Sequence, residues 1–263
     1  MRKLLSAFLM LFTCLISVHG QYTTLNANSH ADYAQITPFY SAYYAHYGSI
    51  EADVWAVKGV LYIAQDSSGI IASKTLEALY LQPVVTEFRK NGGKAWSDIP
   101  ATFQLMIDLK TTVEPTLSLL VEALKKYPDV FDFNVNPNAV QIVITGNRPQ
   151  PTDFNKYPVW ISFDGNVTLK YDAQQLKRVA LYSQNMADLT DWKGKTPLSE
   201  TDENILKQII GTVHGLNKKI RFRNAPDTAY AWRTLMKLKV DYLNTDHNQD
   251  LATYLENYKP SIK

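Results

Sequence analysis

The sequence predicts a single-domain α/β protein built as a (β/α)8 barrel of the TIM type. Apolar, strand-like runs alternate with helix-like segments along the chain, and eight such strand–helix units can be counted. The length of 263 residues suits one barrel, a fold that typically takes about 250 residues. No proline- or glycine-rich linker divides the chain.

The expected strands are apolar or β-branched runs that stop at glycine or at a polar residue. The run VQIVIT, for example, stops at Gly146, and the run VWISF stops at Asp164. In chain order, the strands are expected at residues 22–28, 49–55, 103–110, 140–145, 159–163, 178–183, 219–222 and 240–243. Residues 59–64 are either a hairpin partner or a continuation of the second strand.

Helical segments alternate with these strands. Proline at position 38 opens the first helix, because proline suits the first turn. The helices are expected at residues 38–47, 74–90, 114–127, 200–214, 227–238 and 248–258, with a short one before residue 178. This alternation predicts a parallel sheet.

The first 20 residues have the order of a cleaved signal peptide. Arg2 and Lys3 precede an uncharged run, and residues 18–20 include the small residues that a signal peptidase prefers. We therefore expect a signal peptide at 1–20, the barrel domain at 21–263, and a secreted or periplasmic protein. Cys14, the only cysteine, lies in the leader in a poor context for lipid attachment, and anchoring there stays open.

Cleavage of this leader would leave a nearly neutral chain. Loss of Arg2 and Lys3 reduces the 27 basic residues to 25, which equals the number of acidic residues. Because the chain has no basic stripe, a nucleic acid is not an expected partner. With no cysteine left, the core rather than disulfides must stabilise the fold.

Two carboxylates on the second strand are the first sign of a functional site. Glu51 and Asp53 are two residues apart, so they project from one face of that strand. They repel each other on an apolar strand unless a cation or proton lies between them, although an edge strand with two solvated acids is the alternative. Asp108 ends the next strand, so three carboxylates could supply oxygen ligands for Ca²⁺ or Mg²⁺.

Polar side chains also follow the other strands, at the barrel end where this fold carries its chemistry. His30 is expected to be the only histidine at a strand end and to transfer protons near neutral pH. Lys110 and an arginine could neutralise an anionic group bound on the metal. The other strand-end residues are Asn147, Arg148, Asp164, Ser183, Arg223, Asn244 and Asp246. The set favours an anionic, phosphorylated substrate.

Eight segments resemble the bacterial and fungal branch of the PLC-like phosphodiesterases. That branch is labelled altered inheritance of mitochondria-type and is related to glycerophosphodiester phosphodiesterases. The segments are NSHADY (28–33), SIEADV (49–54), LEALYL (76–81), IDLK (107–110), ITGNRP (144–149), FDG (163–165), RFRNAPD (221–227) and VDYLNTD (240–246). The resemblance implies a TIM-type barrel and a secreted or envelope phosphodiesterase that depends on a divalent metal.

The same resemblance implies residue roles. The metal ligands would be Glu51, Asp53 and Asp108. The catalytic positions would be those of His30, Lys110 and Gln65. The substrate would be bound by Asn147, Arg148, Asp164, Arg221 and Arg223.

Three departures from the family pattern bear on activity. Ala31 replaces the asparagine after the motif histidine, Arg223 replaces a tryptophan, and Gln65 replaces the second catalytic histidine. In-line cleavage of a phosphodiester needs one group to take a proton from the attacking oxygen and another to protonate the leaving oxygen. Glutamine cannot transfer a proton at neutral pH, so half of the acid–base pair is missing.

Two functions of different kinds stay open from the sequence. One is a weak or altered phosphodiesterase that hydrolyses a glycerophosphodiester or phospholipid head group with His30 and a metal. The other is a catalytically impaired barrel that binds a phosphorylated ligand or surface lipid without turnover. A carbohydrate-binding or carbohydrate-hydrolysing barrel fits less well, because Lys110 and Arg223 suit an anion. Peripheral membrane contact is a further expectation, and the oligomeric state stays open.

Overall fold

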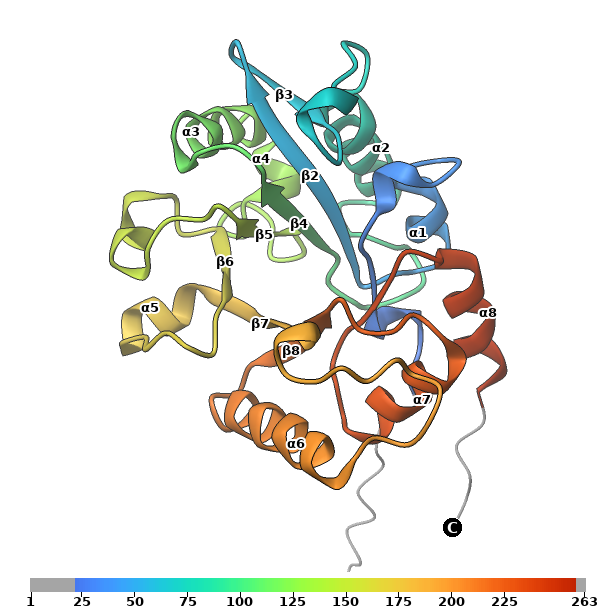
Figure 1. Cartoon of the computed structure of the whole chain (residues 1–263). Coiled ribbons are helices and arrows are strands. Elements are labelled where there is room, and N and C mark those ends of the chain that lie inside the picture. Colours follow the sequence, from blue (N-terminus) through green and yellow to red (C-terminus); the bar gives the residue numbers. More distant parts are fainter. Residues whose placement is uncertain (1–21, 259–263) are drawn as a thin grey trace, which may run out of the picture.

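The computed structural model describes residues 22–258, so the expected signal peptide lies outside the described residues. Eight parallel strands form a near-closed barrel inside a ring of helices (Figure 1), which confirms the predicted fold. The strand order is β8-β7-β6-β5-β4-β2-β1-β9. A single bridge between Arg221 and Tyr242 joins the two ends of this order and brings the barrel close to closure.

The described residues form nine strands. The barrel consists of β1 (Ala27–Ser29), β2 (Ser49–Val57), β4 (Gln104–Leu109), β5 (Gln141–Gly146), β6 (Ile161–Gly165), β7 (Val179–Asn185), β8 (Lys219–Arg223) and β9 (Leu243–Thr245). The remaining strand, β3 (Val60–Ile63), pairs antiparallel with β2, so residues 59–64 are the hairpin partner rather than a continuation. Lys58 and Gly59 form the turn with positive φ angles of 50° and 80°.

The helices surround the barrel. They are α1 (Tyr40–Tyr44), α2 (Gln82–Lys90), α3 (Val113–Leu124), α4 (Pro128–Phe131), α5 (Ala173–Arg178), α6 (Glu200–Gly215), α7 (Ala229–Lys237) and α8 (Asn248–Asn257). A π-helical turn (Glu77–Leu81) leads into α2, and 3₁₀ turns occupy several loops, including Pro151–Lys156 between β5 and β6. Within residues 22–258, no helix is long and apolar enough to cross a membrane.

Of the expected elements that differ in extent, the first strand, the first helix and the last strand show the physical reasons. The first strand begins only at Ala27, because the residues before it form a 3₁₀ turn capped by Thr23. The first helix ends at Tyr44, and His46 has a positive φ of 57° that no α-helix accommodates. The last strand lies at 243–245 instead of 240–243, since Val240 is buried in the preceding loop, where its apolar side chain reflects core packing.

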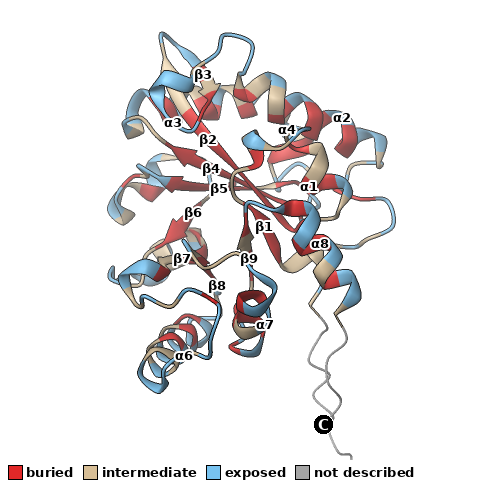
Figure 2. Cartoon of the chain, turned by 45° about the vertical axis from the view of Figure 1, so that its right-hand side comes forward, coloured by how far each residue is buried: buried red, intermediate tan, exposed pale blue. Residues whose placement is uncertain are grey.

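Alternation along the strands divides the core into two parts. Outward-facing side chains pack against the helices in one large cluster, and Figure 2 shows the buried strands inside the exposed outer faces of the helices. Inside the barrel, a separate apolar layer consists of Met106, Val143, Leu181 and Tyr242. Polar side chains occupy the next positions toward the carboxyl ends of the strands, so the fold supplies a closed floor beneath a polar mouth.

Candidate active site

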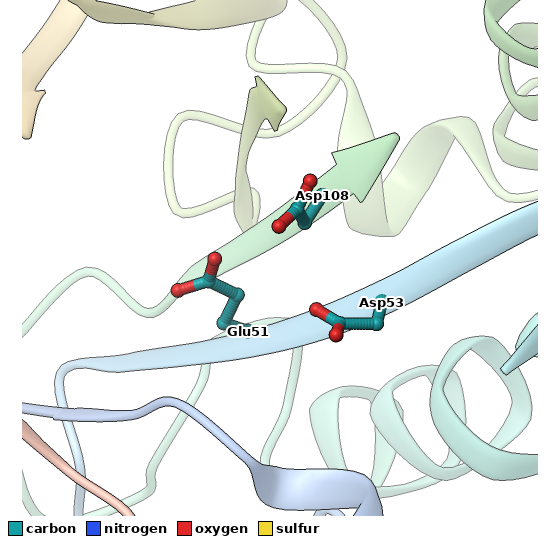
Figure 3. A group of neighbouring side chains, drawn as sticks. All are labelled: Glu51, Asp53 and Asp108. Atoms are coloured by element: carbon teal, nitrogen blue, oxygen red, sulfur yellow. The ribbon is translucent and has the colours of Figure 1, made fainter. Parts of the chain in front are cut away.

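Three buried carboxylates converge at the mouth of the barrel (Figure 3). Glu51 and Asp53 project from β2, and Asp53 is directly opposite Asp108 of β4 in the parallel pairing. One oxygen from each of the three residues lies within 4.8 Å of the others. All three side chains are buried, so the alternative of an edge strand with solvated acids is wrong.

The two acids of β2 differ in their ionisation. Burial raises the pKa of Asp53 to about 6, and repulsion from Asp108 and Glu51 adds to this effect against the charge of Lys110. Burial alone would also raise the pKa of Glu51, but the charge of Arg221 outweighs it and lowers that pKa to about 2. The site therefore holds one firmly ionised carboxylate and one that retains its proton in slightly acidic solution.

Lys110 lies against the two aspartates. Its Nζ is 2.7 Å from Oδ2 of Asp108 and 3.1 Å from Oδ2 of Asp53. Burial lowers the pKa of Lys110, but the hydrogen bond and charge of Asp108 together with the charge of Asp53 raise it overall, so the ammonium stays charged. Lys110 thus bridges the two aspartates rather than pairing with one. This position at the edge of the carboxylates suits contact between its ammonium and a bound anion.

Arg221 lies beneath the carboxylates with no exposed surface. Its guanidinium forms an ion pair with Glu51 and donates to Oγ of Ser183 at 2.6 Å and to Oδ1 of Asn244 at 3.2 Å. Asp164 of β6 is also buried, with its Oδ2 4.0 Å from Arg221. The structure thus places two of the expected substrate-binding residues, Arg221 and Asp164, in the barrel interior below the mouth.

His30 directly follows β1 at the rim of the same mouth. Its Nδ1 lies 3.0 Å from Oδ1 of Asp246, which also accepts the backbone N–H of Ala31 at 3.2 Å. Burial lowers the pKa of His30, but the hydrogen bond to Asp246 and the charge of Glu51 raise it overall. Since Asp246 engages Nδ1, Nε2 remains for proton transfer.

His247 corrects the expectation that His30 is the only histidine at a strand end. It is exposed and follows β9 by two residues. The error arose because the last strand was expected to end at residue 243, which left position 247 in a loop.

The other expected residues lie around the carboxylates rather than on them. Gln65 is exposed and follows Ala64, whose backbone N–H donates to the carbonyl of Asp53 at 3.3 Å. Asn147 donates to the backbone carbonyls of Lys110 and Thr111, each at 3.3 Å.

Arg148 follows β5 by two residues and lines a cleft of about 910 Å³. Glu114, Lys125 and Tyr157 share this cleft with it. Its charge also acts on the buried carboxyl of Asp164, because burial raises the pKa of Asp164 while the charges of Arg221 and Arg148 oppose that rise.

Two residues that support the site, Gly146 and Tyr33, were not predicted as site residues, and a third, Asp246, was predicted only as a polar strand-end residue. Gly146 has a φ of +67°, and a Cβ there would lie 1.8 Å from Oδ1 of Asp108. Tyr33 lies near Asp53, and burial together with the charge of Asp53 raises the pKa of Tyr33 to about 12. Asp246 orients His30. The sequence carried a signal for Gly146, which ends its strand, and for Asp246, which follows the last strand, but not for the pairing of Asp246 with His30.

The donor set suits a hard divalent cation. Carboxylate oxygens are the ligands that Ca²⁺ and Mg²⁺ prefer. Lys110 engages Oδ2 of both aspartates and Arg221 engages Oε2 of Glu51, whereas Oε1 of Glu51 makes no hydrogen bond with the described residues. Burial, together with repulsion from Asp108 and Glu51, raises the pKa of Asp53 even beside Lys110, so a further cation would favour its ionised form.

Comparison with known families and sequences gives consistent matches. The family described as the AIM6-like phosphodiesterase domain matches residues 17–156. The altered inheritance of mitochondria protein 6 homolog of Arthroderma benhamiae is 24% identical over 251 residues, covering 83% of this chain and 80% of that protein. Altered inheritance of mitochondria protein 6 of Kluyveromyces lactis is 22% identical over 300 residues, covering 87% of this chain and 72% of that protein.

Solved structures show the same fold. A glycerophosphodiester phosphodiesterase from Parabacteroides distasonis matches with a TM-score of 0.55 and 12% identity, covering 88% of this chain and 96% of that one. A phosphodiesterase from Oleispira antarctica, in complex with its product sn-glycerol-3-phosphate, matches with a TM-score of 0.53 at the same identity and coverage. At this identity, the likeness extends to the barrel architecture.

Proposed function

Because the chain belongs to the AIM6-like phosphodiesterase family, we propose that it is a phosphoric diester hydrolase that depends on a divalent metal. The observation that carries this proposal is the buried group of Glu51, Asp53 and Asp108 with Lys110 at its edge. The substrate class is a glycerophosphodiester or a phospholipid head group. The Oleispira antarctica enzyme with bound sn-glycerol-3-phosphate supports a small phosphodiester.

Each charged residue at the mouth has a part in this proposal. Glu51, Asp53 and Asp108 would hold Ca²⁺ or Mg²⁺, which supplies charge neutralisation for the phosphate oxygens. Lys110 lies where its ammonium can contact a non-bridging oxygen of the same phosphate. Arg221 keeps Glu51 ionised from below, since the ion pair lowers the pKa of Glu51 to about 2.

Proton transfer is assigned to His30. Asp246 fixes its ring through Nδ1, so Nε2 can give a proton to the leaving oxygen or take one from the attacking oxygen. The second proton transfer lacks a titratable side chain at Gln65, and general acid–base catalysis typically contributes about 10²–10⁴-fold per group. We therefore expect slow turnover.

The second candidate function is a barrel that binds a phosphorylated ligand or lipid without turnover. Gln65 and Ala31 favour it, because both replace residues of the family's catalytic motifs. In this case the carboxylates and Lys110 would still bind metal and phosphate. The two candidates therefore differ in turnover and share their ligands.

Hydrolysis of glycerophosphocholine, followed by ³¹P NMR with Mg²⁺ or Ca²⁺ and with EDTA, separates these functions. The proposed hydrolase forms product only with metal, and His30→Ala abolishes the reaction. His214→Ala is the matched control, because His214 of α6 also pairs with an aspartate, at 2.9 Å, outside the barrel. Metal-dependent phosphate binding without product would favour the second function, and equal loss in both variants would contradict the role of His30.

Export is a separate proposal that rests on residues 1–20. The charged start, the apolar run and the small residues before position 21 support cleavage after Gly20. Intact mass of the protein recovered from the medium or periplasm should correspond to a start at Gln21. Recovery of the full-length chain in the cytoplasm, or of a lipid adduct on Cys14, would contradict it.

A further inference from the structure

Arg223 occupies a place in the barrel mouth that the proposed chemistry does not use. Arg221, two positions earlier on β8, points into the barrel and contacts Glu51, and side chains two apart on a strand share a face. Arg223 therefore also faces the interior, one step nearer the mouth. It lies opposite Asn185 of β7 in the pairing and is half-buried.

This arginine differs from the other cations at the mouth in its partners. Lys110 pairs with two aspartates, and His30 pairs with Asp246. Arg223 forms no ion pair with any residue in 22–258, and its Nε is buried without a hydrogen-bond partner. An unsatisfied charged donor destabilises a folded chain, so a ligand that accepts from it would remove a penalty.

The strand order fixes where such a ligand would extend. Going from β8 to β4 takes four steps in an eight-stranded barrel, so the two strands lie on opposite walls. Lys110 follows β4 and Arg223 ends β8, which places Arg223 across the mouth from the candidate phosphate position. A guanidinium has a planar pair of donors that matches a carboxylate or a phosphate.

We propose that Arg223 selects substrates that carry a second anionic group, a carboxylate or a phosphate monoester, on the alcohol part of the phosphodiester. This inference rests on the proposed function and deepens it. The scissile phosphate lies at the carboxylates and Lys110, while the second anion reaches the opposite wall. Arg223 is a specificity residue in this account and takes no part in proton transfer.

Two matched substrate pairs test the proposal and separate the two anions. Glycerophosphoserine differs from glycerophosphoethanolamine by one carboxylate, and glycerophosphoinositol 4-phosphate differs from glycerophosphoinositol by one phosphate. Wild type should show higher kcat/KM for the anionic member of at least one pair. Arg223→Met should reduce that preference about 10- to 100-fold, the value of a hydrogen bond to a charged group. Arg223→Lys, which keeps the positive charge but loses the planar pair of donors, should show a preference between those of wild type and Arg223→Met.

Controls distinguish this role from a structural one. Arg89→Met removes a surface arginine that pairs with Asp129, and it should keep the wild-type preference. Arg223→Met should melt no lower than wild type, because the arginine pairs with no side chain in residues 22–258. A preference that is absent in wild type, or kept in Arg223→Met, overturns the proposal.

If the protein hydrolyses none of the four diesters, that outcome contradicts the proposed hydrolase activity. The second-anion site is then tested by a binding experiment. Calorimetry with Mg²⁺ then compares 3-phosphoglycerate with sn-glycerol 3-phosphate, which differ by a carboxylate in place of a hydroxymethyl group. Tighter binding of 3-phosphoglycerate that Arg223→Met removes supports the second-anion site. Equal affinity for the two compounds rejects it.

Discussion

Replacement of Asp53 by asparagine should stabilise the metal-free protein. Asp53 is 6% exposed, and its pKa is about 6 against an ordinary 3.8, a difference of about 2.2 units. Since the folded state binds the proton more tightly than the unfolded state, wild-type stability falls as pH rises from about 4 to about 6 and then stays low. At 1.36 kcal/mol per unit, the ionised carboxylate costs about 3 kcal/mol at pH 8, and Asp53→Asn avoids that cost.

Thermal melting in EDTA and in excess Mg²⁺ or Ca²⁺ checks this reasoning. At pH 8 in EDTA, Asp53→Asn should melt about 6–12 °C above wild type, and the gap should close near pH 4. Metal at a hundredfold excess over Kd should then stabilise wild type by about 2.7 kcal/mol and the variant far less.

Asp153→Asn is the control for this experiment, because Asp153 forms only a surface pair with Lys156. It should change stability by less than about 0.5 kcal/mol at either pH. A variant that is no more stable than wild type in EDTA, and that responds equally to metal, would refute the account of the site.

Three further substitutions test separate parts of the site. Gln65→His should raise phosphodiesterase activity by up to about 10²–10⁴-fold. The gain should be larger for glycerophosphodiesters than for bis(p-nitrophenyl) phosphate, because the leaving group of the latter needs no protonation. A wild type already as fast as ordinary phosphodiesterases would argue against this prediction. Asp246→Asn should move the limb of the pH–rate profile that reports His30 to lower pH, because the carboxylate that raises the pKa of His30 is lost. An unmoved limb would show that Asp246 does not control the ionisation of His30. Gly146→Ala should abolish the metal-induced rise in Tm, since its Cβ would collide with the aspartate of β4, whereas Gly211→Ala, with nothing within 4 Å, should not affect it.

Local patterns were enough to predict the barrel and the carboxylates. The period of two on a strand places Glu51 and Asp53 on one face, and parallel strands bring Asp108 beside them. Each of these inferences depends on near neighbours in the chain or on the general rule that strand ends meet at one rim.

The partners of these residues could not be predicted in the same way. Arg221 and Glu51 are 170 positions apart, and His30 and Asp246 are 216 apart. Arg221 was expected to bind substrate because its segment resembles a family motif, and its buried partner Glu51 could not be identified from the sequence. Closure of the barrel, which brings β8 and β9 against β1 and β2, decides these contacts.

A crystal structure with Mn²⁺ and sn-glycerol 3-phosphate tests the central claim most directly. The account predicts an anomalous peak bonded to one oxygen each of Glu51, Asp53 and Asp108, with the phosphate between this ion and Lys110. An anomalous peak elsewhere, or a phosphate bound away from these carboxylates, would contradict it.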